Sequence, residues 1–227
     1  STNKAETESW NGTSWTEVND LNLARGQLSG AGASNTSSLA FGGTVAPPFN
    51  DVKTETEVWN GTNWTEVNDM NTARRRGGGF GIATAAINAA GSNSSGSDIA
   101  IAEYYNGTNW TEVNDLNTAR VLDGSGAGEY TAGLIAGGSA SPYAQTESWN
   151  GTNWTEVNDL NTGRRALAGI GTQTSALAAG GNPLRSIVEE WNGTNWTEVA
   201  DLNTGTEAAG DGGTTTSAIV AGGGQAA

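Results

Sequence analysis

A segment that runs from Trp10 to Arg25 recurs five times along the 227-residue chain, and this repeat limits the folds open to it. Its first copy reads Trp-Asn-Gly-Thr-Ser-Trp-Thr-Glu-Val-Asn-Asp-Leu-Asn-Leu-Ala-Arg. The copies are 49, 46, 44 and 42 residues apart and begin at Trp10, Trp59, Tyr105, Trp149 and Trp191. A period of about 40–50 residues is typical of a unit of four short strands that must stack on its neighbours to bury a core. We therefore expect an all-β, five-bladed β-propeller of four-stranded antiparallel blades.

Asn-Gly turns between paired aromatic residues predict the two outer strands of each blade. Residues 7–10 and 15–18 alternate and flank Asn11-Gly12, which is the strongest short-range signal for a β-hairpin. Strand alternation puts Glu8 and Glu17 on the same face as the two aromatic residues of this hairpin. We expect the aromatic pairs to form the outer core of the blades and to pack on neighbouring blades. They are Trp10, Trp15, Trp59, Trp64, Tyr105, Trp110, Trp149, Trp154, Trp191 and Trp196.

Small residues follow each copy, as in Gly77-Gly78-Gly79, and precede an apolar strand that ends in a small pair such as Gly42-Gly43. Glycine normally weakens a strand. The innermost strands of a five-bladed ring converge on its axis, where there is little room for side chains, so we expect these small-residue strands to line the axis. Variation in length falls almost wholly in the loop after the small pair, and the rest of each repeat is scaffold.

The ordered pattern resembles the repeat of the kelch family of β-propellers, with the matching residues Gly42-Gly43, Trp59, Trp64, Met70 and Arg74. The resemblance covers all 227 residues and implies a propeller. The chain departs from the kelch pattern by using Trp-Asn-Gly where those repeats usually carry Tyr-Asp-Pro, and by placing Thr206 where the last Arg would stand. The nearly identical copies are also similar to repeats in tail-associated or other virion proteins of marine phages. That similarity implies an interaction or structural role, with the chain on a virion surface.

The strand order at the two ends of the chain predicts how the ring closes. The sequence opens on two aromatic strands and stops after a small-residue strand and an apolar strand that reaches Gly222-Gly223. A fifth blade would take two strands from each end, with residues 1–18 completing it. Such a 2+2 clasp would remove the open sheet edges. Residues 1–227 are thus expected to form one monomeric closed ring.

Composition excludes several classes of chemistry. The chain has no cysteine and no histidine, which rules out thiol catalysis, Cys or His metal ligands and the commonest general base. A net charge of −14 argues against binding to nucleic acid or to anionic membranes. No apolar run approaches the roughly 18 residues of a membrane span, and no signal peptide is visible. We expect a soluble, non-enzymatic protein without a cofactor, and its compartment stays undetermined.

A glutamate and an arginine recur at fixed places in the repeat. Glycoside hydrolysis needs one specific pair of carboxylates around one bond, whereas a pair copied into every blade is better explained as a structural ion pair. The Asn-Asp-Leu-Asn segments could supply oxygen ligands to calcium, but turn chemistry explains them equally well, and we expect no metal site. The repeated residues are Glu8, Glu57, Glu103, Glu147, Glu189, Arg25, Arg74, Arg120 and Arg164.

The variable loops are the expected binding surface, because binding residues are often carried on loops that a rigid scaffold holds. These loops should share one face with the Asn-Asp-Leu-Asn segments, while the Asn-Gly-Thr hairpins should share the other face. Whether the loops bind a partner or only tolerate insertions stays open. The alternative function is a multivalent carbohydrate-binding lectin, in which the repeated tryptophans stack on sugars at several sites. Candidate partner-binding residues are Pro47, Pro48, Phe49, Tyr143, Leu184 and Arg185.

Overall fold

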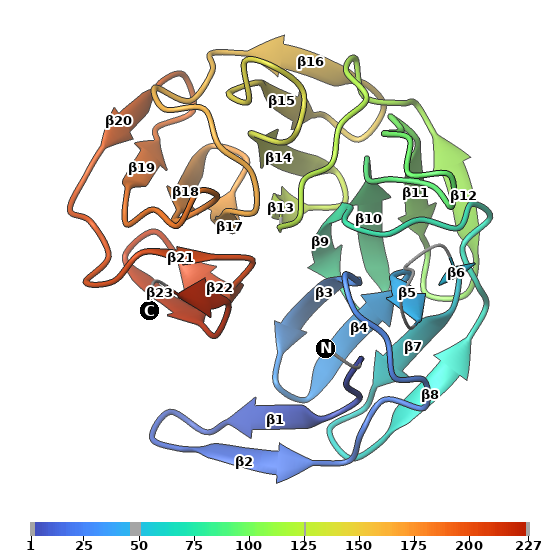
Figure 1. The fold of residues 1–227 in the computed structure, drawn as a ribbon. Helices are drawn as coiled ribbons and strands as arrows, with labels where there is room; N and C mark the ends of the chain where they lie inside the picture. The colour runs from blue at the N-terminus through green and yellow to red at the C-terminus, as the bar shows by residue number, and fades with distance from the viewer. Residues whose placement is uncertain (1–2, 46–50, 125, 226–227) are drawn as a thin grey trace.

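The computed structural model describes residues 3–45, 51–124 and 126–225, and this part of the chain contains strands but no helix. Small antiparallel sheets stand side by side around an axis, with the first strand of each sheet nearest to it (Figure 1). The all-β propeller arrangement predicted from the repeat is therefore confirmed.

Four sheets are complete four-stranded antiparallel blades. Blade 1 consists of β3 (Ser29–Ser34), β4 (Ser37–Phe41), β7 (Thr56–Trp59) and β8 (Trp64–Val67). Blade 2 consists of β9 (Gly78–Ile82), β10 (Ala85–Ala89), β11 (Ala102–Tyr105) and β12 (Trp110–Val113). Blade 3 consists of β13 (Ala127–Glu129), β14 (Ala132–Ala136), β15 (Thr146–Trp149) and β16 (Trp154–Val157). Blade 4 consists of β17 (Ala168–Thr172), β18 (Ser175–Ala179), β19 (Val188–Trp191) and β20 (Trp196–Glu198).

Two further hairpins each have the strands of half a blade. The N-terminal one pairs β1 (Thr7–Trp10) with β2 (Trp15–Val18), and the C-terminal one pairs β22 (Gly210–Thr214) with β23 (Ser217–Ala221). They stand at the two ends of the arc of complete blades (Figure 1). Shorter ladders join β5 (Thr44–Val45) to β6 (Asp51–Val52), and β21 (Thr206–Glu207) to β24 (Gly224–Gln225).

The structure corrects the expected count of complete blades from five to four. In the part of the chain that is described, β1 does not pair with β23, so the two terminal hairpins stay separate two-stranded sheets and the 2+2 clasp is not formed. The fifth repeat, which would span this seam, has Thr206 where the other four repeats have an arginine, as described below. The strand order within each complete blade is as predicted, with the small-residue strand innermost and the two aromatic strands outermost.

Crowding at the axis explains the small residues of the inner strands. A Cβ atom added to Gly79 in β9 would lie 2.3 Å from the carbonyl oxygen of Gly30 in β3 of the preceding blade. A Cβ atom on Gly124 would lie 2.1 Å from the carbonyl oxygen of Leu167. Adjacent inner segments therefore approach each other more closely than any side chain would permit.

A series of backbone hydrogen bonds links successive repeats around the axis, and we call it the axial belt. The amide of Arg76 donates to the Gln27 carbonyl at 2.9 Å, and the amide of Asp123 donates to the Arg76 carbonyl at 3.2 Å. The next links run from the Ala166 amide to the Leu122 carbonyl and from the Ala208 amide to the Ala166 carbonyl, both at 2.8 Å. The five belt residues with left-handed backbone, at φ values between 52° and 61°, are Gln27, Arg76, Asp123, Ala166 and Ala208.

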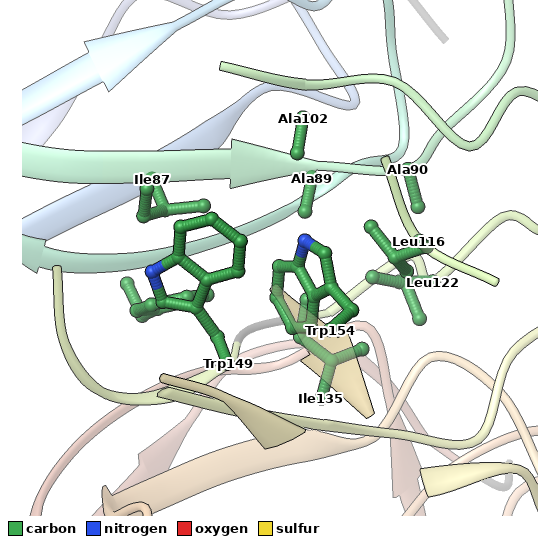
Figure 2. Close-up of a cluster of buried hydrophobic side chains, with 10 residues drawn as sticks. Ile87, Ala89, Ala90, Ala102, Leu116, Leu122, Ile135, Trp149 and Trp154 are labelled. Atoms are coloured by element: carbon green, nitrogen blue, oxygen red, sulfur yellow. The ribbon is translucent and has the colours of Figure 1, made fainter. Parts of the chain in front are cut away.

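In blades 2 to 4, the second tryptophan of the outer hairpin packs against the preceding blade. Trp154 of blade 3 lies in a core cluster with Ile87 and Ala102 of blade 2 and with its own hairpin partner Trp149 (Figure 2). Its ring makes an edge contact with Phe80, with a centroid separation of 6.1 Å. Trp110, Trp154 and Trp196 are only 5–6% exposed. By contrast, Trp15 in the N-terminal hairpin is 48% exposed, because no complete blade covers it.

Candidate functional site

Each complete blade buries one ion pair between the repeated arginine and the repeated glutamate. Arg25 lies 3.2 Å from the carboxylate of Glu57 in blade 1. Arg164 lies 2.5 Å from the carboxylate of Glu189 in blade 4. All eight side chains are no more than 1% exposed. The other two pairs are Arg74 with Glu103 and Arg120 with Glu147.

The segments between an outer strand and the next inner strand carry these arginines, and we call them the junctions (residues 19–25, 68–74, 114–120, 158–164 and 200–206). In blade 4, the backbone amide and the Nδ2 of Asn161 donate to Oε2 of Glu189 at 2.7 and 2.8 Å. The same Nδ2 also donates to the carbonyl of Trp196 at 2.9 Å. The asparagine therefore ties the junction to the two outer strands of the blade it crosses.

Hydrogen bonding sets the charge state of the Glu189 carboxyl. Burial alone would raise its pKa, but hydrogen bonds from Arg164 and Asn161 outweigh burial, and the pKa is lowered from its usual value. For the cationic arginines burial acts in the opposite direction. It lowers the pKa of Arg25 and of Arg74, although nearby carboxylates act to raise it. This enclosed geometry fits a structural ion pair, because a general acid must contact its substrate to act.

The fifth repeat lacks this ion pair. Thr206 stands at the arginine position, and its Oγ1 bonds instead to the carbonyl oxygens of Gly222 and Gly224 at 3.2 and 3.1 Å. The matching glutamate, Glu8, is exposed and has no ion-pair partner in the described part of the chain. The predicted array of repeated pairs is thus interrupted at the place where the ring would close.

Hydrogen bonds from the interblade tryptophans recur at several interfaces but not at all of them. Nε1 of Trp110 donates to the hydroxyl of Thr56 at 3.0 Å, and Nε1 of Trp196 donates to the hydroxyl of Thr146 at 3.1 Å. The corresponding residue of blade 4, which would face Trp15 across the seam, is Val188 and has no hydroxyl. This hydrogen bond is also missing between blades 2 and 3, where Ala102 faces Trp154, so the missing ion pair is what distinguishes the seam.

The aromatic pairs offer little open ring surface. The two rings of each hairpin are tilted on each other, with centroid separations of 5.2–5.5 Å. In blades 2 to 4 both members are buried by the hairpin and the neighbouring blade. A sugar that stacks on an aromatic side chain needs an open face, and among these outer-hairpin pairs the most exposed ring is that of Trp15.

Three of the predicted binding residues, Tyr143, Leu184 and Arg185, lie in described parts of the variable loops. Pro47, Pro48 and Phe49 lie outside the described residues. Tyr143 and Leu184 are 48% and 40% exposed. Arg185 is partly buried, and its Nε has no hydrogen-bond partner among the residues described. The Tyr143 carbonyl accepts from the Arg164 amide at 2.7 Å, and the Arg185 carbonyl accepts from the Thr206 amide at 3.1 Å. Each of these two loops therefore rests on the junction to the next blade.

The junctions contact the variable loops, as the bond from the Arg164 amide to the Tyr143 carbonyl shows, and the first asparagine of a junction also reaches a hairpin turn of the neighbouring blade. Nδ2 of Asn19 in the first junction donates to the carbonyl of Thr62 and to Oδ1 of Asn63, at 2.9 and 2.7 Å, in the hairpin of the following blade. Asn114 and Asn158 repeat these two contacts in the later blades. The right-handed twist of a four-stranded blade turns its outer hairpin well away from the inner strands, which brings the hairpin turn to the preceding junction.

A charged pair near the axis was not predicted from the sequence. Nε and Nη2 of Arg76 donate to the two carboxylate oxygens of Asp123 in the next repeat. Both side chains are partly exposed and line a central cavity of about 1350 Å³ that extends to Trp15 and Ile219 at the seam. Neither residue recurs in the other repeats, so no repeated pattern in the sequence marks this pair.

Two further features are absent from the described residues. They contain no group of three or more acidic, cysteine or histidine side chains that could hold a metal ion. Nor does any helix in these ranges have the length and apolar character needed to cross a membrane. A scan against models of known protein families finds no match to the chain, and a search of curated proteins finds no significant match.

Proposed function

We propose that this chain is a non-catalytic binding propeller, which presents its variable loops to a protein partner. The observation that carries the proposal is the exposure of Tyr143 and Leu184 in corresponding loops of neighbouring blades. Tyrosine is enriched at protein interfaces and among the residues that contribute most of their binding energy, and the exposed leucine adds apolar contact area. The resemblance of the repeats to virion proteins suggests another virion component as the partner.

Repeated backbone hydrogen bonds support the base of these loops, which favours binding over passive tolerance of insertions. The Gly138 amide at the start of one loop donates to the Arg164 carbonyl at 3.1 Å, and the Gly181 amide donates to the Thr206 carbonyl at 2.8 Å. The loops therefore differ in side chains and in length, while the backbone hydrogen bonds at their base are repeated from blade to blade. Variable side chains on a fixed support are a common design for recognition.

Binding can be tested with a pair of exposed-residue variants. We expect Tyr143→Ser combined with Leu184→Ser to abolish binding to a partner found on protein arrays. Tyr130→Ser is the matched control, because Tyr130 is 38% exposed and lies in the β13–β14 turn, at the opposite end of β14 from the variable loop. Equal loss in the control variant would contradict the assignment. Several equivalent glycan sites per chain on a glycan array would instead favour the lectin.

In the proposed working form the two terminal hairpins join as the fifth blade. Aligned on the repeat, β23 corresponds to β4 and β1 to β7, so the register Leu39↔Val58 in blade 1 places Ile219 opposite Ser9. Pairing would cover Ile219, which is 40% exposed, and Trp15. It would also bring the Gln27 amide to the Ala208 carbonyl and so complete the axial belt. Burial of apolar surface and removal of open edges both favour this closure.

An engineered disulfide tests closure directly, because the chain has no cysteine of its own. We expect the Ser9→Cys/Ile219→Cys protein to form an intramolecular disulfide under mild oxidation. The control is Leu177→Cys/Glu190→Cys, which places cysteines at the same register in the complete blade 4. If the control closes and the Ser9/Ile219 pair gives only intermolecular disulfides or none, the ring does not close within one chain.

A further inference from the structure

Four repeats fill a buried site with a guanidinium group, and blade 4 shows the acceptors that surround it. Nε of Arg164 donates to the Gly180 carbonyl, Nη2 donates to the Ala178 carbonyl and Nη1 donates to the Thr162 carbonyl, each at 2.8 Å. Nη1 also donates to Oε1 of Glu189 at 2.5 Å. Three carbonyls and a carboxylate thus enclose one cation.

The fifth repeat supplies the same acceptors without the cation. By position in the repeat, Gly222 matches Gly180, while Val220, Thr204 and Glu8 match the other three acceptors. The Thr206 hydroxyl lies 3.2 Å from the Gly222 carbonyl and replaces the Nε contact. Threonine is too short to reach further. On closure, the carbonyls of Val220 and Thr204 and the carboxylate of Glu8 would surround the space that a guanidinium group fills elsewhere.

We infer that the closed ring binds one guanidinium cation at the fifth blade, between Glu8, Val220 and Thr204. This inference rests on the proposed closure of the ring. The ligand class is a guanidinium-bearing group, such as an arginine side chain of the partner. A carboxylate buried without a cation is costly, and a planar guanidinium offers several donors in the geometry that a carboxylate and nearby carbonyls accept.

Closure and ligand binding would support each other. The cation compensates the burial of Glu8, so a ligand that binds only the closed form shifts the hairpins toward the joined state. The other four blades keep their own arginine in this position, which explains why one site is expected and not five. The repeat that lacks its arginine is also the repeat divided between the two ends of the chain.

The test measures binding of methylguanidinium to the full chain, by titration calorimetry and by thermal unfolding, against sodium chloride at equal ionic strength. We expect one saturable site per chain and a rise in Tm. Glu8→Gln removes the carboxylate charge, and Thr206→Arg supplies the missing side chain. Both variants should weaken binding by about tenfold or more, as expected for the loss of a charged hydrogen bond or of the free site.

Arg164→Ala is the matched positive control, because it empties the same kind of site in a complete blade. We expect this variant to gain a second methylguanidinium site. Absence of saturable binding to the unaltered chain would overturn the inference, as would binding that Thr206→Arg leaves unchanged. Methylguanidinium binding that appears only in the Arg185→Gln variant would also overturn the inference. It would mean that in the unaltered chain the side chain of Arg185 itself fills the site.

The disulfide experiment separates the two proposals. If the Ser9→Cys/Ile219→Cys protein closes within one chain but does not bind methylguanidinium, the cation site is wrong while the closed ring stands. If the disulfide does not form within one chain, both proposals fail. The binding role of the loops is independent of either result, because Tyr143 and Leu184 lie in blades 3 and 4.

Discussion

Ala102 and Trp154 lie in the same core cluster, between blades 2 and 3. At the two neighbouring interfaces the position of Ala102 is a threonine, whose hydroxyl accepts a hydrogen bond from the indole nitrogen. Nε1 of Trp154 is buried and has no hydrogen-bond partner among the described residues. Figure 2 shows this nitrogen directed toward the β10–β11 side of the cluster, where Ala89 and Ala102 lie. An unsatisfied buried donor costs stability.

Restoring a hydroxyl at this interface should stabilise the protein. We expect Ala102→Thr to raise the free energy of unfolding by about 1 kcal/mol, measured by urea denaturation, because Trp154 gains a hydrogen bond. The converse change, Thr146→Ala, should remove the bond to Trp196 and lower stability by a similar amount. If both variants match the unaltered chain, these hydrogen bonds contribute nothing measurable.

The Arg164–Glu189 pair makes stability depend on acid pH. The folded-state pKa of Glu189 is lowered from its usual value of 4.5, so the pair stabilises the fold at neutral pH. This contribution to stability should decrease as the pH falls below the usual glutamate pKa, and it should be lost as the pH falls through the lowered pKa of the folded state. Urea unfolding at a series of pH values from about 7 to about 3 will measure the decline.

Breaking the same pair should flatten that decline. We expect Glu189→Gln to cost about 3–5 kcal/mol at neutral pH, because Arg164 is left buried without its counter-charge, and to reduce the loss in acid. Glu190→Gln is the control, since Glu190 is the next residue on β19 and projects to the opposite face. An equal effect of both substitutions would exclude a specific role for the pair.

Close approach of the inner strands can be tested with one methyl group. Gly79→Ala would set a Cβ atom 2.3 Å from the Gly30 carbonyl oxygen, and the strands must move apart to admit it. We expect a loss of about 1–3 kcal/mol, as in other overpacked sites. Gly212→Ala in β22 is the control, because its Cβ would meet nothing within 4 Å. Similar unfolding midpoints for the two variants would argue against crowding at the axis.

The axial belt makes a separate prediction at Ala166. Its φ is 56°, and its amide donates to the Leu122 carbonyl at 2.8 Å. Ala166→Pro can neither reach this φ nor donate the bond, so we expect a loss of about 3 kcal/mol or more. Ala166→Gly keeps both properties and should stay within about 1 kcal/mol of the unaltered chain. Chemical denaturation of the two variants measures the difference, and equal stability would show that the belt link is dispensable.

Repetition made much of the blade predictable. The aromatic residues flanking each Asn-Gly turn predicted the span of the outer hairpins and the side chains that share a face, and β1 and β2 begin and end where expected. The glycine runs predicted which strands lie innermost. The recurrence of one glutamate and one arginine pointed to a structural ion pair, and the structure pairs Arg25 with Glu57 of the following copy at 3.2 Å.

Features without a repeated side chain were missed. The belt residues Gln27, Arg76, Asp123 and Ala166 share a backbone conformation but no chemistry, so no pattern marks them. The contact of Asn19 with Asn63 depends on the accumulated twist of a blade, which a strand-by-strand analysis of the sequence does not contain. The open seam was missed for a similar reason, since strand counting identifies complementary halves but not the energy of joining them.

The contacts between blades repeat from copy to copy: in four junctions an asparagine contacts the hairpin of the next copy, and each belt link uses only backbone groups. Almost any copy could therefore follow almost any other without a new interface having to arise. At the level of the gene, nearly identical segments are natural points for unequal recombination. Gain or loss of a whole blade would meet compatible neighbours on both sides, so the number of blades could change in a single event while the side chains of the loops diverged separately.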